Sequence, residues 1–172
     1  MIWSTKLRVP AHTDSGVNLK LQREMKARIA YYAQHPAEIP RRLEELDQEW
    51  DIERAIEANA SSLSFAGLML ATAVDRRWLA LPAVVTGFLF QHAVQGWCPP
   101  LPLLRRLGFR TADEINQERY ALRALRGDFS LIERASNKVA AVLNAIGLSW
   151  GAAAEESASA EVRAHEPAVP PV

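Results

Sequence analysis

The sequence contains almost no cysteine and no excess of charge of either sign. Cys98 is the single cysteine among 172 residues, which excludes an intramolecular disulfide framework and a cysteine-rich zinc site. The 20 basic and 20 acidic side chains give a formal net charge of zero. Because nucleic acids attract proteins with excess positive charge, this balance argues against a nucleic-acid partner.

Charged residues are also rare in the middle of the chain. Between residues 58 and 104 the charged side chains are the three consecutive residues Asp75, Arg76 and Arg77. They separate two uncharged stretches, one over residues 58–74 and one that runs from Trp78 past Cys98. Because a membrane-spanning helix needs about 20 apolar residues, the sequence predicts an all-α fold with a two-helix transmembrane hairpin over residues 58–98.

Tryptophans mark the ends of the second uncharged stretch. Trp78 and Trp97 lie 19 residues apart, which is about 28 Å along a helix and close to the separation of the two aromatic belts of a bilayer. We therefore expect both indoles to act as interfacial anchors. The alternative is a soluble helical bundle that buries both stretches, with the two indoles in its core.

Small residues recur at four-residue spacing in both stretches. Gly67 and Ala71 form such a pair in the first, and Ala83 and Gly87 form one in the second. In lipid, small residues at this spacing let two helices approach closely. With a turn centred near Arg77, we expect Gly67 to lie opposite Gly87 and Ala71 to lie opposite Ala83. The alternative is that small residues are simply abundant in an alanine-rich chain.

The distribution of arginine predicts an orientation for the hairpin. Two arginines lie in the turn, whereas the outer ends carry more of them: Arg54, Arg105, Arg106 and Arg110. By the positive-inside rule, both termini are expected to face the cytoplasm of a bacterium, with the hairpin in its inner membrane. Arg105 and Arg106 are expected to reach the lipid headgroups as further anchors.

Amphipathic helices are expected on both sides of the hairpin. Residues 1–57 predict two helices. The first is a basic helix over 14–34, which either lies on an anionic leaflet or packs on a neighbouring helix, and the second is an acidic helix after Pro40. The seven carboxylates from Glu44 to Glu57 predict a solvated face, because their spacing forms no metal-binding loop. Residues 99–150 predict further helices, one opened by a capping box of Thr111 and Glu114. Residues 151–172 predict a disordered tail.

The second uncharged stretch runs into the segment GWCPPLPLLRRLG. With the hairpin before it, this segment resembles the YgaP-like inner-membrane domain family, in which a short two-helix hairpin ends in glycine, an aromatic residue and Cys-Pro, followed by leucines and Leu-Gly. The resemblance covers residues 50–112 and rests on Gly96, Cys98, Pro99, Leu107 and Gly108. It implies an inner-membrane hairpin without an assigned activity. Some members carry a rhodanese domain, but this chain has neither a second cysteine nor room for that fold.

Three residues near the end of the second stretch are candidates for chemistry. Cys98 either reacts as a thiol or packs as a small hydrophobic residue beside Pro99. His92 and Gln95 are expected to lie level with Ser61, Ser62 and Asn59, where they either bond across the two helices or line a polar pathway. Because His92 and Cys98 are six residues apart, they cannot share one face of a continuous helix or complete a zinc site.

These features together predict an integral inner-membrane protein that acts as a scaffold or as an accessory subunit of a larger membrane assembly. Its expected partners are membrane lipids and either further copies of itself or other membrane proteins. We expect no enzymatic activity, cofactor or metal, because no pairing of nucleophile and base and no phosphate-binding loop is evident. The alternative is a small transport or sulfur-relay component that uses Cys98 and His92.

Overall fold

The structure is a computed structural model that describes residues 4–130 and 132–146, and this part of the chain is helical with no strand. It divides into two compact units, residues 1–126 and residues 127–172. The predicted all-α fold is confirmed. The predicted disordered tail, residues 151–172, lies outside the described residues.

Helices α2 (Ser15–Gln34), α3 (Ile39–Gln48) and α7 (Ala112–Arg126) form the head of the first unit, together with the short helix η1 (Pro36–Glu38). Five buried apolar residues make up its core: Ile39, Leu43, Leu46, Ile115 and Leu122. Helix α2 packs against α7. Of the two environments expected for the helix over 14–34, the structure therefore shows packing on a neighbouring helix.

Two helix starts in the head follow directly from local sequence. The Asp14 carboxylate accepts hydrogen bonds from the amides of Gly16 and Val17, at 2.9 and 3.2 Å, and so caps α2. Thr111 and Glu114 form the predicted capping box, in which each side chain accepts a bond from the backbone amide of the other, at 2.9 and 3.2 Å. Such caps satisfy amides that have no partner within the helix.

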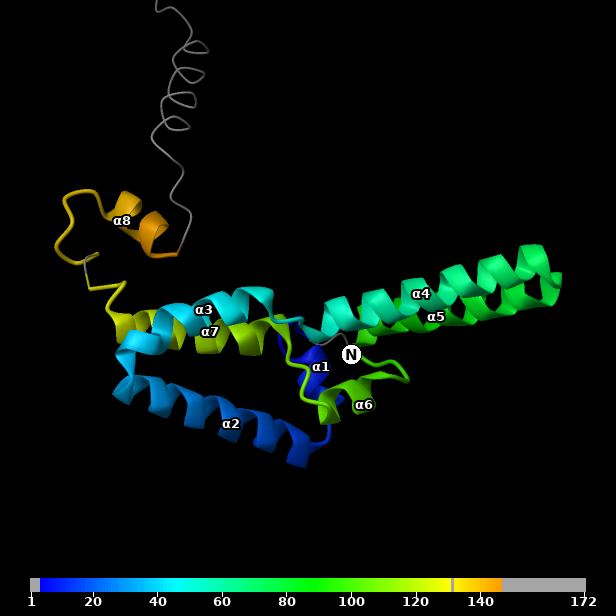
Figure 1. Cartoon of the computed structure of the whole chain (residues 1–172), viewed down its shortest axis with the longest axis horizontal. Helices are drawn as coiled ribbons and strands as arrows, with labels where there is room; N and C mark the ends of the chain where they lie inside the picture. The colour runs from blue at the N-terminus through cyan, green and yellow to red at the C-terminus, as the bar shows by residue number, and fades with distance from the viewer. Residues whose placement is uncertain (1–3, 131, 147–172) are drawn as a thin grey trace, which may run out of the picture. The chain divides into compact units, whose positions relative to one another are not determined.

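The hairpin consists of α4 (Ile52–Ala73), the short helix η2 (Arg76–Leu79) and α5 (Ala80–Gln95). Helices α4 and α5 lie side by side along their length (Figure 1). At its base, the hairpin meets α1 (Arg8–Ala11) and α6 (Leu101–Arg106) around a second core of Val9, Ile52, Ile56, Cys98 and Leu101. This core joins the hairpin to the rest of the first unit.

Within residues 4–130 and 132–146, no helix combines the length and the apolar character that crossing a membrane requires. Helix α4 has 22 residues, but its first two turns contain Glu53, Arg54 and Glu57, and α5 has only 16 residues. A span requires about 20 apolar residues. This finding contradicts the predicted transmembrane hairpin, the inner-membrane location with cytoplasmic termini, and the roles as membrane-anchored scaffold or small transport or sulfur-relay component.

The register of the hairpin also differs from the prediction. Helix α4 ends at Ala73, and Asp75 caps η2 by accepting a bond from the amide of Arg77 at 2.7 Å, so the turn lies near Val74 and Asp75 and not near Arg77. Gly67 is therefore buried against Leu81 and Pro82, whereas a Cβ on Gly87 would meet open space. Gly67 does not face Gly87.

Alanine substitutions at the two glycines should change the free energy of unfolding in opposite directions. A Cβ on Gly67 would lie 2.6 Å from Pro82 Cδ, so Gly67→Ala should lower the free energy of unfolding by about 1 to 3 kcal/mol through overpacking. Gly87→Ala should raise it by about 0.5 to 1 kcal/mol, because alanine favours the helix. Urea denaturation of dilute protein, followed by circular dichroism, measures both. Equal effects of the two substitutions would contradict this register.

The described part of the second unit holds α8 (Lys138–Ala145), which is capped by Asn137 through a bond from the amide of Ala140 at 3.0 Å. It is one of the further helices expected over residues 99–150. Asn137 marks its start, because an asparagine side chain satisfies the first free amide of a helix.

Candidate functional site at the base of the hairpin

A partly buried ion pair joins the two helices of the hairpin at its base. His92 of α5 is 3% exposed, and its Nε2 lies 2.7 Å from Glu53 Oε2 of α4. Arg8 of α1 donates from one nitrogen to Glu53 Oε1 at 2.8 Å and from the other to the carbonyl of Ala93 at 2.8 Å. These three side chains bring α1, α4 and α5 together.

His92 does not make the contacts that the sequence predicted. Ser61 and Ser62 instead donate to the carbonyl of Ala58 within their own helix, at 3.1 and 2.7 Å. Gln95, the third candidate residue, is exposed. The shifted turn accounts for the difference, because it moves the end of α5 toward the charged start of α4.

Cys98 lies beside His92, although the two cannot share a helix face. Helix α5 ends at Gly96, whose φ of +82° is left-handed, a conformation that glycine adopts without steric cost. A Cβ on Gly96 would lie 2.5 Å from the carbonyl oxygen of Arg8. The chain therefore turns back, and Cys98, 2% exposed, enters the core outside the helix. The expectation that the two residues cannot share one face of a continuous helix does not apply here, because Cys98 lies beyond the end of α5.

Cys98 and Glu53 set the charge of His92. Interaction with the Cys98 side chain and then the hydrogen bond and charge of Glu53 raise the pKa of His92 from 6.5 to about 9, although burial lowers it. Burial by itself raises the pKa of Glu53, but His92 and Arg8 outweigh it and leave that pKa below its usual value. At neutral pH the site therefore holds an imidazolium against a carboxylate.

This pKa shift predicts an alkaline loss of stability. A group whose folded pKa is raised contributes fully below its unfolded pKa and loses that contribution as pH rises through the folded value. With the pKa of His92 raised from 6.5 to about 9, the free energy of unfolding should fall by about 3 kcal/mol between these two pH values. Urea denaturation across this range measures it, and His92→Gln should flatten the slope.

The control for this prediction is His35→Gln. His35 is exposed, and its Nδ1 contacts the carbonyl of Tyr31 within the first unit. The substitution should leave the alkaline slope as it is in the original chain. A slope that survives in His92→Gln, or that disappears in His35→Gln, would assign the pH dependence to another group.

An apolar cavity of about 220 Å³ lies next to the site. Helix α4 lines it with Ile56, Asn59, Ala60 and Leu63, helix α5 with Val85, Phe88 and Leu89, and the following segment with Cys98, Pro99 and Pro100. Cys98 thus forms part of the wall of this cavity. The cavity can accept a small apolar group.

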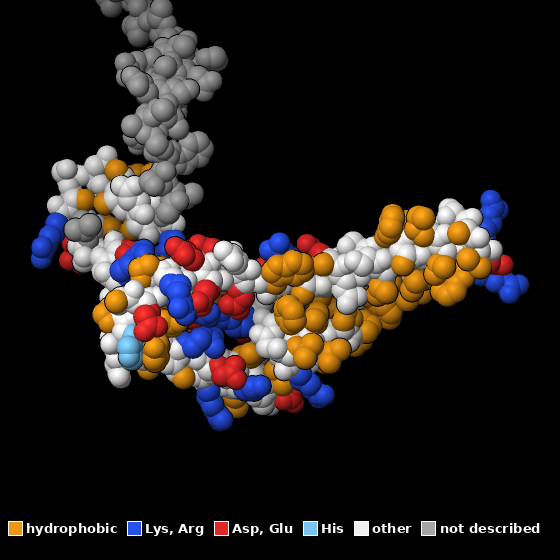
Figure 2. Space-filling model, in the orientation of Figure 1, with side chains coloured by type: hydrophobic (Ala, Val, Ile, Leu, Met, Phe, Trp, Pro, Cys, Tyr) orange, Lys and Arg blue, Asp and Glu red, His pale blue; other side chains and the backbone are white. Residues whose placement is uncertain are grey.

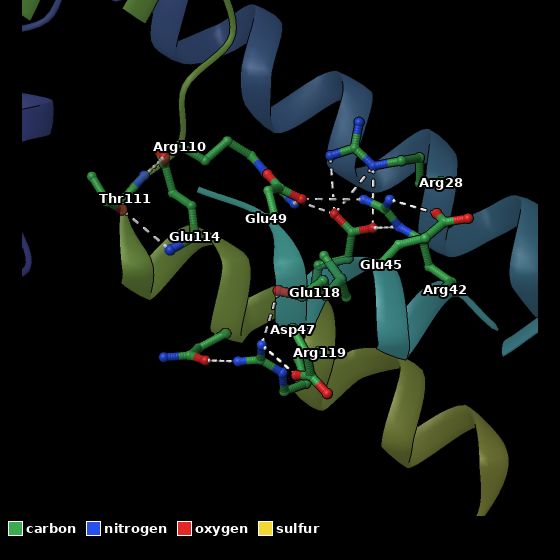
Figure 3. A network of polar contacts seen from close by, with 12 residues as sticks. Arg28, Arg42, Glu45, Asp47, Glu49, Arg110, Thr111, Glu114, Glu118 and Arg119 are labelled. Carbon is green, nitrogen blue, oxygen red and sulfur yellow. Dashed lines mark hydrogen bonds and ion pairs between the residues drawn. The ribbon is translucent and has the colours of Figure 1, made fainter. Parts of the chain in front are cut away.

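A second polar cluster, far larger, lies inside the head. Glu118 of α7 is 0% exposed and accepts hydrogen bonds from Arg28 of α2 at 3.0 to 3.2 Å, from Arg42 of α3 at 2.9 Å and from Arg110. Glu49 binds Arg110 through both oxygens, at 2.7 and 2.6 Å (Figure 3). This network ties three helices together, and because Glu49 belongs to it, the seven carboxylates from Glu44 to Glu57 are only in part the solvated face that we predicted.

The predicted interfacial anchors do not share one environment. Arg105 is buried, with two of its nitrogens on the Glu114 carboxylate at 2.7 and 2.8 Å and a third contact to Asn18 at 2.9 Å. Arg106 and Trp78 are exposed, whereas Trp97 is partly buried against the core at the base of the hairpin. The prediction that Arg105 reaches outward to headgroups is therefore wrong.

Sequence reasoning missed Arg8, Glu53, Arg110 and Glu118 as parts of either polar cluster. Each is an ordinary charged residue in the sequence, and only its position between helices distinguishes it. In the described part of the chain, no group of three or more histidine, cysteine, aspartate or glutamate side chains could hold a metal ion.

Comparison of the chain with protein-family models, with curated proteins and with solved structures finds no match. The resemblance to the YgaP-like family stays a prediction.

Proposed function

We propose that this protein is an assembly module in which the hairpin of one copy binds the hairpin of a second copy. The observation that carries the proposal is the exposed apolar surface of α4 and α5, which Figure 2 shows along the hairpin. Phe65 is 66% exposed and Phe90 is 73% exposed. Contiguous exposed apolar surface of this kind is typical of sites that bind another protein.

The outer face of α5 suits a second copy of itself. Ala83, Gly87, Phe90 and Val94 are all exposed, and at 3.6 residues per turn they lie within about 60° of one another around the helix. The residues near the turn are small and Phe90, nearer the base, is large. A two-fold axis near Gly87 would place Phe90 of each copy against Ala83 of the other, so that one stripe complements itself, as a symmetric dimer requires.

Charge favours an antiparallel arrangement of the two hairpins. The turn carries Arg76 and Arg77, whereas the exposed carboxylate toward the base of α4 is Glu57, since Glu53 is already paired with Arg8 and His92. Antiparallel hairpins would bring the turn of one copy near the base of the other, with opposite charges close together. Parallel hairpins would gather the arginines of both turns at one end, which costs energy through like-charge repulsion.

Binding, and not catalysis, is the activity that the molecule supports best. The ion-pair network around Glu118 fixes α2, α3 and α7 against one another. The head would thus be a rigid unit at the base of each hairpin. We propose a structural role in which self-association brings such heads together.

The molecular mass of the full chain in solution tests this proposal. We expect sedimentation velocity to show a dimer that dissociates on dilution, because apolar burial between hairpins follows mass action. A monomer across the whole concentration range would contradict it. A chain that stays monomeric and instead binds phospholipid vesicles would also contradict it, since the apolar surface would then take lipid in place of a second copy.

A further inference from the structure

The apolar cavity at the base of the hairpin is poorly suited to hold water. None of the side chains that line it is charged, and Asn59 is the one that carries an oxygen or nitrogen atom. A buried water molecule typically makes about two to four hydrogen bonds, and these side chains offer too few partners for that. Replacement of such water by an apolar ligand gains binding free energy.

The size and the wall of the cavity favour a small aromatic ligand. An apolar cavity of about 150 Å³ is large enough to take benzene, so the 220 Å³ found here leaves room for a fused two-ring molecule such as indole. The Phe88 ring lines the wall and packs edge-on against Trp97, with the ring centroids 6.5 Å apart. Contacts between aromatic rings stabilise a complex beyond the area that they bury, which favours an aromatic ligand over an aliphatic one.

The exposure of the lining residues defines how such a ligand would lie. Ile56 is buried in the core at the base of the hairpin, whereas Asn59 is exposed on the same helix. The cavity therefore reaches the surface near Asn59. A ring would face Ile56, and one polar substituent would face the Asn59 amide. A charged substituent would lose hydration without gaining a counter-ion from the lining.

We propose that this cavity is a binding site for a small, uncharged aromatic molecule that carries one hydrogen-bonding group. On α5 the lining residues are Val85, Phe88 and Leu89. At 3.6 residues per turn, they lie on the side of the helix opposite to the stripe around Gly87 that we propose for the dimer. Ligand binding and self-association thus use different faces of α5, and neither depends on the other.

Titration of the full chain with indole, followed by NMR of its methyl groups, tests this proposal. Indole should bind saturably with a dissociation constant below about 1 mM, and the shifts should concentrate at Ile56, Leu63 and Leu89. Indole-2-carboxylate, which adds a negative charge to the same rings, should bind about tenfold more weakly or worse. Indole shifts that do not saturate, or that spread over the whole hairpin, would overturn the site. Equal affinity for the two ligands would also overturn it.

Variants of α4 locate the bound ligand. Ala60→Leu lengthens a side chain that lines the cavity and should weaken indole binding about tenfold or more, because it fills the space. Ala73→Leu makes the same change at an exposed position near the turn and should leave the affinity unchanged. Circular dichroism verifies that both variants are folded. Unchanged binding in Ala60→Leu, or an equal loss in both, would exclude this cavity.

The hydrogen bond to Asn59 is tested with indene, which has the ring frame of indole without its N–H group. Asn59→Ala should weaken the binding of indole by about 2- to 10-fold and leave that of indene unchanged. Equal effects on both ligands would contradict the role of Asn59 as the polar partner. Failure of indole to bind the original chain decides against the site without any variant, and it leaves the proposed dimer untouched.

Discussion

Replacing Glu118 by glutamine is expected to lower the free energy of unfolding by about 3 to 5 kcal/mol, the loss that follows removal of one partner from a buried ion pair. Glu118 is buried and accepts bonds from Arg28, Arg42 and Arg110. Without its charge, these guanidinium groups would lie close together with too few carboxylates. Urea denaturation at neutral pH measures the loss.

The matched control is Glu45→Gln at the edge of the same network. Glu45 also bonds to Arg42, at 3.1 Å, but its side chain is far more exposed. Because solvent screens an exposed ion pair, this substitution should cost far less than Glu118→Gln. Equal losses for the two variants would show that burial of Glu118 does not govern the stability of the head.

The loss of stability at low pH provides a second test of the role of Glu118. Burial alone raises the pKa of Glu118, but bonds from Arg28 and Arg42 and the charge of Arg110 lower it overall. A carboxyl whose folded pKa is lowered contributes stability above its unfolded pKa and loses that stability as pH falls through the folded value. Acid should therefore destabilise the original chain more than it destabilises Glu118→Gln.

Phe90→Asp is expected to convert the proposed dimer to a monomer. Phe90 is highly exposed in the single chain, so the substitution should change the stability of the monomer little. In the dimer it would place an unpaired carboxylate against Ala83 of the other copy, where it would be desolvated. The dissociation constant should rise about 100-fold or more, as for loss of an aromatic anchor.

The control for this prediction is Tyr120→Asp. Tyr120 is an exposed aromatic residue of α7 in the head, outside the hairpin. Sedimentation velocity should show the dimer in Tyr120→Asp and the monomer in Phe90→Asp at the same concentration. Loss of the dimer in both variants, or in neither, would exclude the α5 face as the contact between copies.

Features that arise from residues close together in the sequence, such as helix caps and hydrophobic runs, were predictable from the sequence alone. The capping box of Thr111 and Glu114 needs only a three-residue spacing, and Pro40 and the apolar stripe after it mark α3. The central uncharged stretches predict a helical hairpin for the same reason, since a hydrophobic run without strand alternation favours helix. These parts of the all-α fold follow from local chemistry.

The length of the hairpin helices depends on single residues that end them, and a count of uncharged residues does not identify those residues. Uncharged residues continue to Leu104, but α5 ends at Gln95, because Gly96 takes a left-handed conformation and the chain turns back to the core. The position of the turn likewise follows from the Asp75 cap. Counting uncharged residues overestimated the helix, and the predicted membrane span was wrong for that reason.

The sequence by itself determined where most helices lie and which stretch of the chain is apolar, because caps, turns and hydrophobic runs act over a few residues. Tertiary structure alone decided that Glu118 and Arg105 are buried and what they bind, and that His92 pairs with Glu53. These contacts join residues 9 to 90 positions apart. Their partners are chosen by helix packing and register, which no local spacing specifies.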